Sequence, residues 1–104
     1  MAKVSAVAKL EVKPDKADAF PAAWDDMFKH IAANEDGTEH YVLHRSSRDP
    51  NVFYMTEIYA DQAALDAHGS SDAMAAIGAT LGDFIASADL DFCTPVKAAK
   101  GCDL

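Results

Sequence analysis

The spacing of apolar residues switches between the period of a strand and the period of a helix along the chain, and this order limits the possible folds. Residues 4–12, VSAVAKLEV, alternate apolar and polar side chains with Val7 as the one exception, and predict a half-buried strand. Residues 13–37 then place apolar side chains on one face at helical spacing. We expect Asp15 and Asp18 to cap this helix, while Pro21 predicts either an irregular first turn or a regular helix that begins near Ala19.

The middle of the chain predicts a hairpin. Residues 38–45 and 51–59 are strand-like, and SSRDP between them is a typical turn sequence. Asp61 is then expected to cap a short helix over residues 62–68, which GSS interrupts. A second helix follows through positions 74, 77, 81 and 85, and residues 86–96 predict a last strand.

The predicted order is therefore β-α-β-β-α-β. This order is typical of an α+β, ferredoxin-like fold, in which an antiparallel four-stranded sheet carries its helices on one face. The strands nevertheless have bulky apolar residues at both parities, with Phe53 and Met55 on one side and Tyr54 and Ile58 on the other. An uncovered apolar sheet face is an interaction surface, so we expect a homodimer packed sheet to sheet.

Composition narrows the class of function. A chain of 104 residues suits one domain, which we place at residues 3–96 with a polar tail at 97–104. The formal net charge is −8 and the nine lysines and arginines form no cluster, so we expect neither nucleic-acid nor membrane binding. The start of the chain is strand-like rather than a signal peptide, and we expect the cytoplasm with Cys93 and Cys102 reduced.

Two titratable residues stand out as catalytic candidates. His68 follows Leu65 by three positions on the same helix face, so both are expected to point inward, and a histidine there can hold or pass a proton. Glu57 shares strand parity with bulky residues, and a buried carboxylate needs a partner, for which His68 is a candidate. The alternatives are a buried histidine satisfied by a strand group, and a glutamate satisfied by an arginine or a backbone donor.

Other ligand chemistries have less support. Trp24, Phe28, Tyr54 and Tyr59 are candidate substrate-binding aromatics, although such a set is more often core, and the two tyrosines have opposite strand parity. His40 and His44 are too far apart along a strand to share one metal ion, and we predict no metal site. The sequence has no glycine-rich nucleotide or flavin motif, so we predict no cofactor.

Three stretches resemble the antibiotic biosynthesis monooxygenase family of dimeric α+β barrels: EVKPDKADAFPAAW, NEDGTEHYVLHRS and FYMTEIYADQAALDAHGSSDAM. The resemblance covers residues 3–96. The family's usual pattern of a strand glutamate, an acidic helix cap and a histidine ending ALxAH falls on Glu57, Asp61 and His68. The haem-degrading branch needs a tryptophan where this chain has Tyr59 and a histidine near Gly78, so haem degradation is disfavoured.

The resemblance implies a cofactor-independent monooxygenase that acts with dioxygen on a small or polycyclic phenol, hydroquinone or anthrone. In this hypothesis His68 is the base or a hydrogen-bonding anchor and Glu57 orients it. The alternatives are an isomerase or proton-transfer enzyme acting on a small carbonyl compound, and a non-catalytic dimer that binds a small ligand. Oxygen consumption would discriminate the first from the second, and a closed pocket or a fully hydrogen-bonded His68 would indicate the third.

Overall fold

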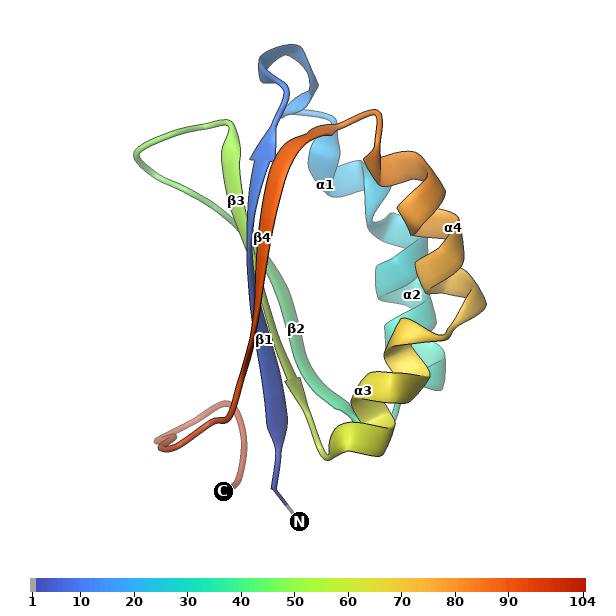
Figure 1. The fold of residues 1–104 in the computed structure, drawn as a ribbon, viewed down its shortest axis with the longest axis vertical. Coiled ribbons are helices and arrows are strands. Elements are labelled where there is room, and N and C mark those ends of the chain that lie inside the picture. The colour runs from blue at the N-terminus through green and yellow to red at the C-terminus, as the bar shows by residue number, and fades with distance from the viewer. Residues whose placement is uncertain (1) are drawn as a thin grey trace.

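The computed structural model describes residues 2–104, which form one antiparallel sheet with all helices on one of its faces (Figure 1). Along the chain the elements are β1 (Val4–Val12), η1 (Pro14–Lys16), α1 (Phe20–Ala23), α2 (Asp25–Asn34), β2 (Thr38–Arg45), β3 (Val52–Tyr59), α3 (Gln62–Gly69), α4 (Asp72–Leu81) and β4 (Ile85–Cys93). The strand order in the sheet is β2-β3-β1-β4, and every neighbouring pair is antiparallel. This arrangement confirms the predicted ferredoxin-like α+β fold.

The first helical region is broken into three pieces. A 3-10 turn precedes the short α1, and Pro21 lies in the first turn of α1, where a missing backbone N–H costs no helical hydrogen bond. The chain then bends at Trp24 and continues as α2. The expectation of an irregular first turn is therefore confirmed, whereas the predicted aspartate caps are wrong: none of the three pieces has a side-chain cap, and Asp18 pairs with Arg45 instead.

The second helical region begins as predicted. The Asp61 side chain accepts a hydrogen bond from the Ala64 backbone N–H at 2.9 Å, and Ser71 caps α4 in the same way. Helix α4 ends at Leu81, so the extension of the helical pattern to Ile85 is wrong, since that residue opens β4. The turn before β2 packs closely on α3, because a Cβ on Gly37 would lie 2.6 Å from the Ala64 Cβ.

The hydrophobic core fills the space between the sheet and the helices. Its fully buried side chains come from alternate positions of β1 and β3 and from the inner faces of the helices, and the largest are Phe20, Met27, Phe53, Met55 and Tyr59. Among the described residues, His68 is the one polar or charged residue that is buried with them.

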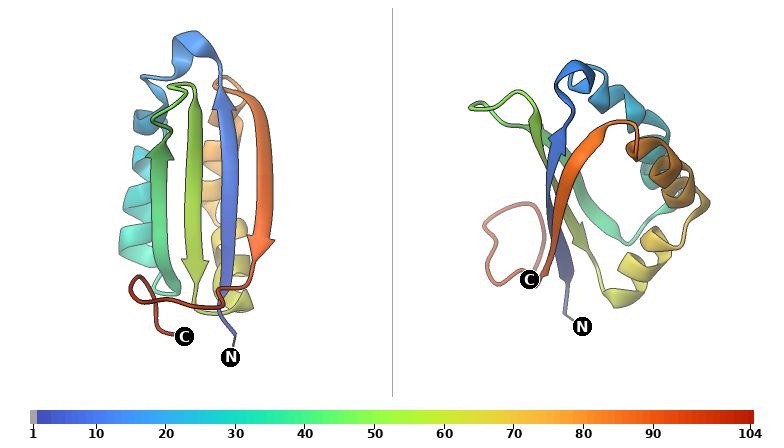
Figure 2. Two further views of the ribbon diagram at one scale, coloured as in Figure 1. Left: turned by 90° about the vertical axis from the view of Figure 1, so that its left-hand side faces the viewer. Right: turned by 45° about the horizontal axis from the view of Figure 1, so that its top comes forward.

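The opposite face of the sheet carries no helix (Figure 1, Figure 2). Val7 and Val42 are 42% and 37% exposed there, beside polar groups such as Thr56. After β4 the tail turns onto this side and crosses one end of the sheet, where Asp103 and Leu104 lie near Lys3 (Figure 2). No helix in residues 2–104 has the length and apolar character that a membrane crossing requires.

Candidate functional site

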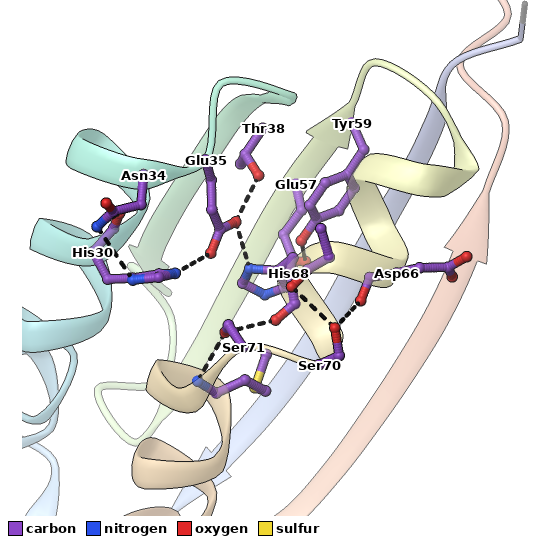
Figure 3. Close-up of polar contacts among 12 residues, drawn as sticks. His30, Asn34, Glu35, Thr38, Glu57, Tyr59, Asp66, His68, Ser70 and Ser71 are labelled. Atoms are coloured by element: carbon purple, nitrogen blue, oxygen red, sulfur yellow. Dashed lines mark hydrogen bonds and ion pairs between the residues drawn. The ribbon is translucent and has the colours of Figure 1, made fainter.

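His68 lies in the last turn of α3 with 2% of its surface exposed. Its Nδ1 atom lies 2.9 Å from Oε1 of Glu35, within hydrogen-bonding distance (Figure 3). Its other ring nitrogen, Nε2, is buried and has no hydrogen-bond partner among residues 2–104. Because a carboxylate only accepts, the pairing places a proton on Nδ1, so in the neutral imidazole the lone pair is on Nε2. The imidazole is therefore held in the tautomer that a base needs.

Glu35 follows the last residue of α2 and is the central acceptor of this cluster. Its side chain is 8% exposed, and its Oε1 also accepts a hydrogen bond of 2.8 Å from the Thr38 hydroxyl. Nε2 of His30 lies 3.0 Å from Glu35 Oε2, although the two groups are not aligned for a hydrogen bond (Figure 3). Neither Glu35 nor His30 was predicted from the sequence as a site residue. The NEDG stretch indicates only a helix end, and the contact arises because α3 packs on the turn at Gly37.

Glu57 lies on the helix-facing side of β3, as its parity predicted. The predicted hydrogen bond between Glu57 and His68 is wrong, since the imidazole binds Glu35 and the Glu57 carboxyl accepts from the Tyr59 hydroxyl (Figure 3). Burial raises the pKa of the Glu57 carboxyl above its usual range, and the Tyr59 hydrogen bond and the nearby imidazole oppose this only in part. The carboxyl therefore holds a proton more readily than an exposed glutamate.

Two tyrosines flank the imidazole. The ring centroids of Tyr41 and Tyr59 lie 5.2 and 5.4 Å from that of His68. Burial raises the pKa of both phenols well above the ordinary range, and the negative charge of Glu57 adds to this effect. Both hydroxyl groups therefore stay protonated at neutral pH, and that of Tyr59 donates to Glu57.

An open pocket of about 540 Å³ lies beside this cluster, between the first two helices and β2. Its apolar wall is formed by aromatic and aliphatic side chains, and three charged residues complete the lining: Pro21, Trp24, Phe28, Tyr41, Val42, Leu43 and Phe53, with Asp25, Lys29 and Arg45. A pocket of this volume with a mostly apolar lining is typical of a binding site for a small molecule. Two of the four predicted substrate-binding aromatics, Trp24 and Phe28, lie in its wall.

The other two predicted aromatics lie elsewhere. Tyr59 is fully buried beside His68, while Tyr54 is paired with His44 across β2 and β3 and points to the helix-free face. Neither residue lines the pocket, and neither does His68. Tyr41 is the link, because it borders the pocket and its ring also packs on the imidazole.

The part of the chain that the structure describes holds no set of three or more histidine, cysteine, aspartate or glutamate side chains arranged for a metal ion. His40 and His44, which strand spacing alone would separate widely, each place Nε2 at 2.9 Å from the Thr56 hydroxyl on the helix-free face. Cys93 and Cys102 are free thiols.

Comparisons with known proteins agree with this architecture. The family model for antibiotic biosynthesis monooxygenases matches residues 3–80. A crystal structure from Caulobacter crescentus, assigned provisionally to the same family, is 33% identical, with a TM-score of 0.86 and 92% of each chain covered. Rv0793 of Mycobacterium tuberculosis is 25% identical, with a TM-score of 0.83 and 95% of this chain and 100% of that chain covered. No curated protein matches the chain.

A further solved structure shares the fold at lower identity. It comes from Bacteroides thetaiotaomicron, is also assigned provisionally to the family, and is 18% identical with a TM-score of 0.84 over 95% of this chain and 94% of that chain. The family match extends from the first strand through the helix that ends at Leu81, and so includes Glu35, Glu57 and His68. The chain therefore belongs to the antibiotic biosynthesis monooxygenase family.

Proposed function

We propose that this protein is a cytoplasmic monooxygenase that acts, without a metal or flavin, on a phenol-, hydroquinone- or anthrone-type substrate. The observation that carries the proposal is the state of His68: a buried imidazole whose Nδ1 is held by Glu35 and whose Nε2 is free. Such a group is ready to accept a proton in a site from which water is excluded. The provisional names of the Caulobacter and Bacteroides structures support the same class of reaction.

The proposed reaction begins with proton transfer. For an anthrone, Nε2 of His68 takes a proton from the ring CH₂ group or its enol, and the resulting anion reduces dioxygen and forms a carbon–oxygen bond. Loss of the second proton from that carbon then breaks the O–O bond, which leaves a ketone on the ring and releases the other oxygen atom as water. The substrate supplies all four electrons that dioxygen accepts, two when the carbon–oxygen bond forms and two when the O–O bond breaks, and the protein supplies the base, the orientation and a dry site.

The surrounding residues have distinct proposed roles. Glu35 orients His68 and stabilises the imidazolium that forms, which is the task that sequence analysis assigned to Glu57. We propose that Glu57, held by Tyr59, provides a carboxyl group close to the imidazole. Because Tyr41 separates the pocket from His68, we propose that its side chain moves aside when substrate enters.

We propose that the active form is a homodimer in which a second copy covers the helix-free face of the sheet. Val7 and Val42 are exposed at the middle of this face, and half-buried Ile58 lies on the same side. Exposed aliphatic side chains on a flat sheet favour burial against another copy, with two-fold symmetry as the usual solution. Most residues that line the pocket at Trp24 lie on the helix side of the sheet, and Val42, which also lines it, marks its border with the proposed interface.

Oxygen uptake by the purified, metal-free protein tests the proposed function. We expect consumption above background with at least one member of a panel of hydroquinones and anthrones, and a decrease of at least tenfold in His68→Ala and His68→Gln. Asp66→Ala is the matched control, because this titratable residue lies on the same helix as His68 but is exposed and does not line the pocket. Circular dichroism and sedimentation would verify fold and assembly. Turnover that survives both His68 substitutions would refute the role of His68.

A second candidate function uses the same groups without oxygen. The imidazole of His68, whose Nε2 has no hydrogen-bond partner among residues 2–104, packs against the rings of Tyr41 and Tyr59, whose phenols stay protonated, and a base held in this way suits the transfer of a proton next to a carbonyl group. Isotope exchange from deuterated water into a small carbonyl substrate, without oxygen consumption, would identify such an isomerase. Saturable binding with neither reaction would instead identify a ligand-binding dimer.

A further inference from the structure

We propose that the pocket beside Tyr41 is selective for an aromatic acid, whose ring lies against the apolar wall and whose carboxylate is bound by Lys29 and Arg45. This proposal deepens the proposed function, because it names the chemical class of ligand that the pocket accepts. It rests on two observations: the aromatic wall and the position of the two cations in the lining of the pocket.

The wall of the pocket suits a flat ring system. Trp24, Phe28 and Tyr41 form a connected aromatic set, with ring centroids 6.4 Å apart for Trp24 and Tyr41 and 5.4 Å apart for Phe28 and Tyr41. Phe53 and Leu43 extend this apolar surface across the sheet. Aromatic rings bury large apolar areas and prefer tilted or offset partners, so a ligand of two or three fused rings fits a pocket of about 540 Å³.

The charged residues of the pocket favour an anion. Lys29 and Arg45 both line it, whereas Asp25 is its single acidic residue. Lys29 forms no salt bridge with any residue of the described chain 2–104, and a ligand carboxylate would provide one. Elsewhere the protein repels anions, since its formal net charge is −8 with only nine lysines and arginines.

Arg45 is already oriented for this task. Its guanidinium lies over the Phe53 ring, 5.3 Å from the centroid, and its Nε donates to the Pro50 carbonyl at 2.8 Å. One Nη group binds Asp18 at 2.9 Å, and the Asp18 side chain is 96% exposed. These contacts hold the planar group at the pocket and use only part of its five N–H donors, so further donors remain for a carboxylate.

Fluorescence of Trp24 provides a direct test, because it is the only tryptophan in the chain and lies in the pocket wall. The probes are 1-hydroxy-2-naphthoate and its neutral amide, 1-hydroxy-2-naphthamide, titrated without oxygen at low ionic strength, with calorimetry as a second measurement. We expect the acid to bind at least fivefold more tightly than the amide. Lys29→Gln and Arg45→Gln should each weaken acid binding by about fivefold, the size expected for a partly exposed charge pair, and should weaken amide binding by a clearly smaller factor.

Arg48→Gln and Lys97→Gln are matched controls, because each removes the same charge from an exposed position outside the pocket. Equal affinity for the acid and the amide would overturn the proposal, and so would an equal loss in the control variants. The test is independent of turnover. Selective binding of the acid without oxygen uptake would contradict the proposed function alone, whereas oxygen uptake with no preference for acids would contradict only the ligand class.

Discussion

Removing the Glu35 carboxylate should destabilise the protein far more than removing a neighbouring exposed one. Glu35 is 8% exposed in its side chain and accepts hydrogen bonds from His68 and Thr38 at 2.9 and 2.8 Å. A hydrogen bond to a charged group contributes about 1.5–3 kcal/mol, and a buried donor left without an acceptor costs a similar amount. Glu35→Ala should therefore lower the free energy of unfolding by about 2–4 kcal/mol.

Urea denaturation at neutral pH and fixed protein concentration measures this effect. With a slope of about 2 kcal/mol per molar urea, the middle of the usual range for small proteins, the unfolding midpoint should fall by about 1–2 M. Asp36→Ala is the matched control, because Asp36 is the next residue, is exposed, and should change stability by less than about 0.5 kcal/mol. Glu35→Gln, which keeps an acceptor oxygen, should lie between the two.

A double-mutant cycle assigns the effect to the pair rather than to Glu35 alone. His68→Leu removes the donor, so Glu35→Ala should be less damaging in that background, with a coupling energy of about 1–3 kcal/mol. Two results would refute this reasoning. One is a Glu35→Ala variant no less stable than Asp36→Ala, and the other is full additivity with His68→Leu.

Two further predictions concern the buried carboxyl group and the helix-free face. Burial raises the pKa of Glu57 in the folded protein, so its contribution to stability is fully present below the ordinary glutamate pKa of about 4.3 and is lost as pH rises through the raised value. The free energy of unfolding of Glu57→Gln, compared with that of the native protein, should thus increase from acid to neutral pH. If urea unfolding gives the same difference at every pH, the raised pKa of Glu57 would be contradicted. Val7→Asp places a charge on the exposed sheet face and should weaken a dimer at least tenfold by sedimentation, whereas Ser47→Asp in the β2–β3 turn should not. A dimer that persists unchanged in Val7→Asp would show that assembly uses another surface.

The sequence determined the fold because the fold depends on local periodicity and on turn chemistry. Alternation over residues 4–12, 38–45 and 51–59 marks strands, and the Asp61 cap marks a helix start, since each depends on neighbours a few residues away. The same local information placed His68 on the inner face of its helix and Glu57 on the inner face of its strand. Trp24 and Phe28, predicted as substrate-binding aromatics, pack in or against the core and also line the pocket, and their role in binding stays a prediction.

Which groups meet in the site depended on the tertiary structure. Glu35 and His68 are 33 positions apart, and they pair because Gly37 lets the turn before β2 approach α3 so closely that no Cβ fits between them. Glu57 is nearer to His68 in sequence, yet its carboxyl binds Tyr59, two residues along the same face of β3. A periodic pattern shows which side of an element a residue faces, but the partner of a polar atom depends on how the elements pack, and this explains why the sequence identified the histidine but not the carboxylate that holds it.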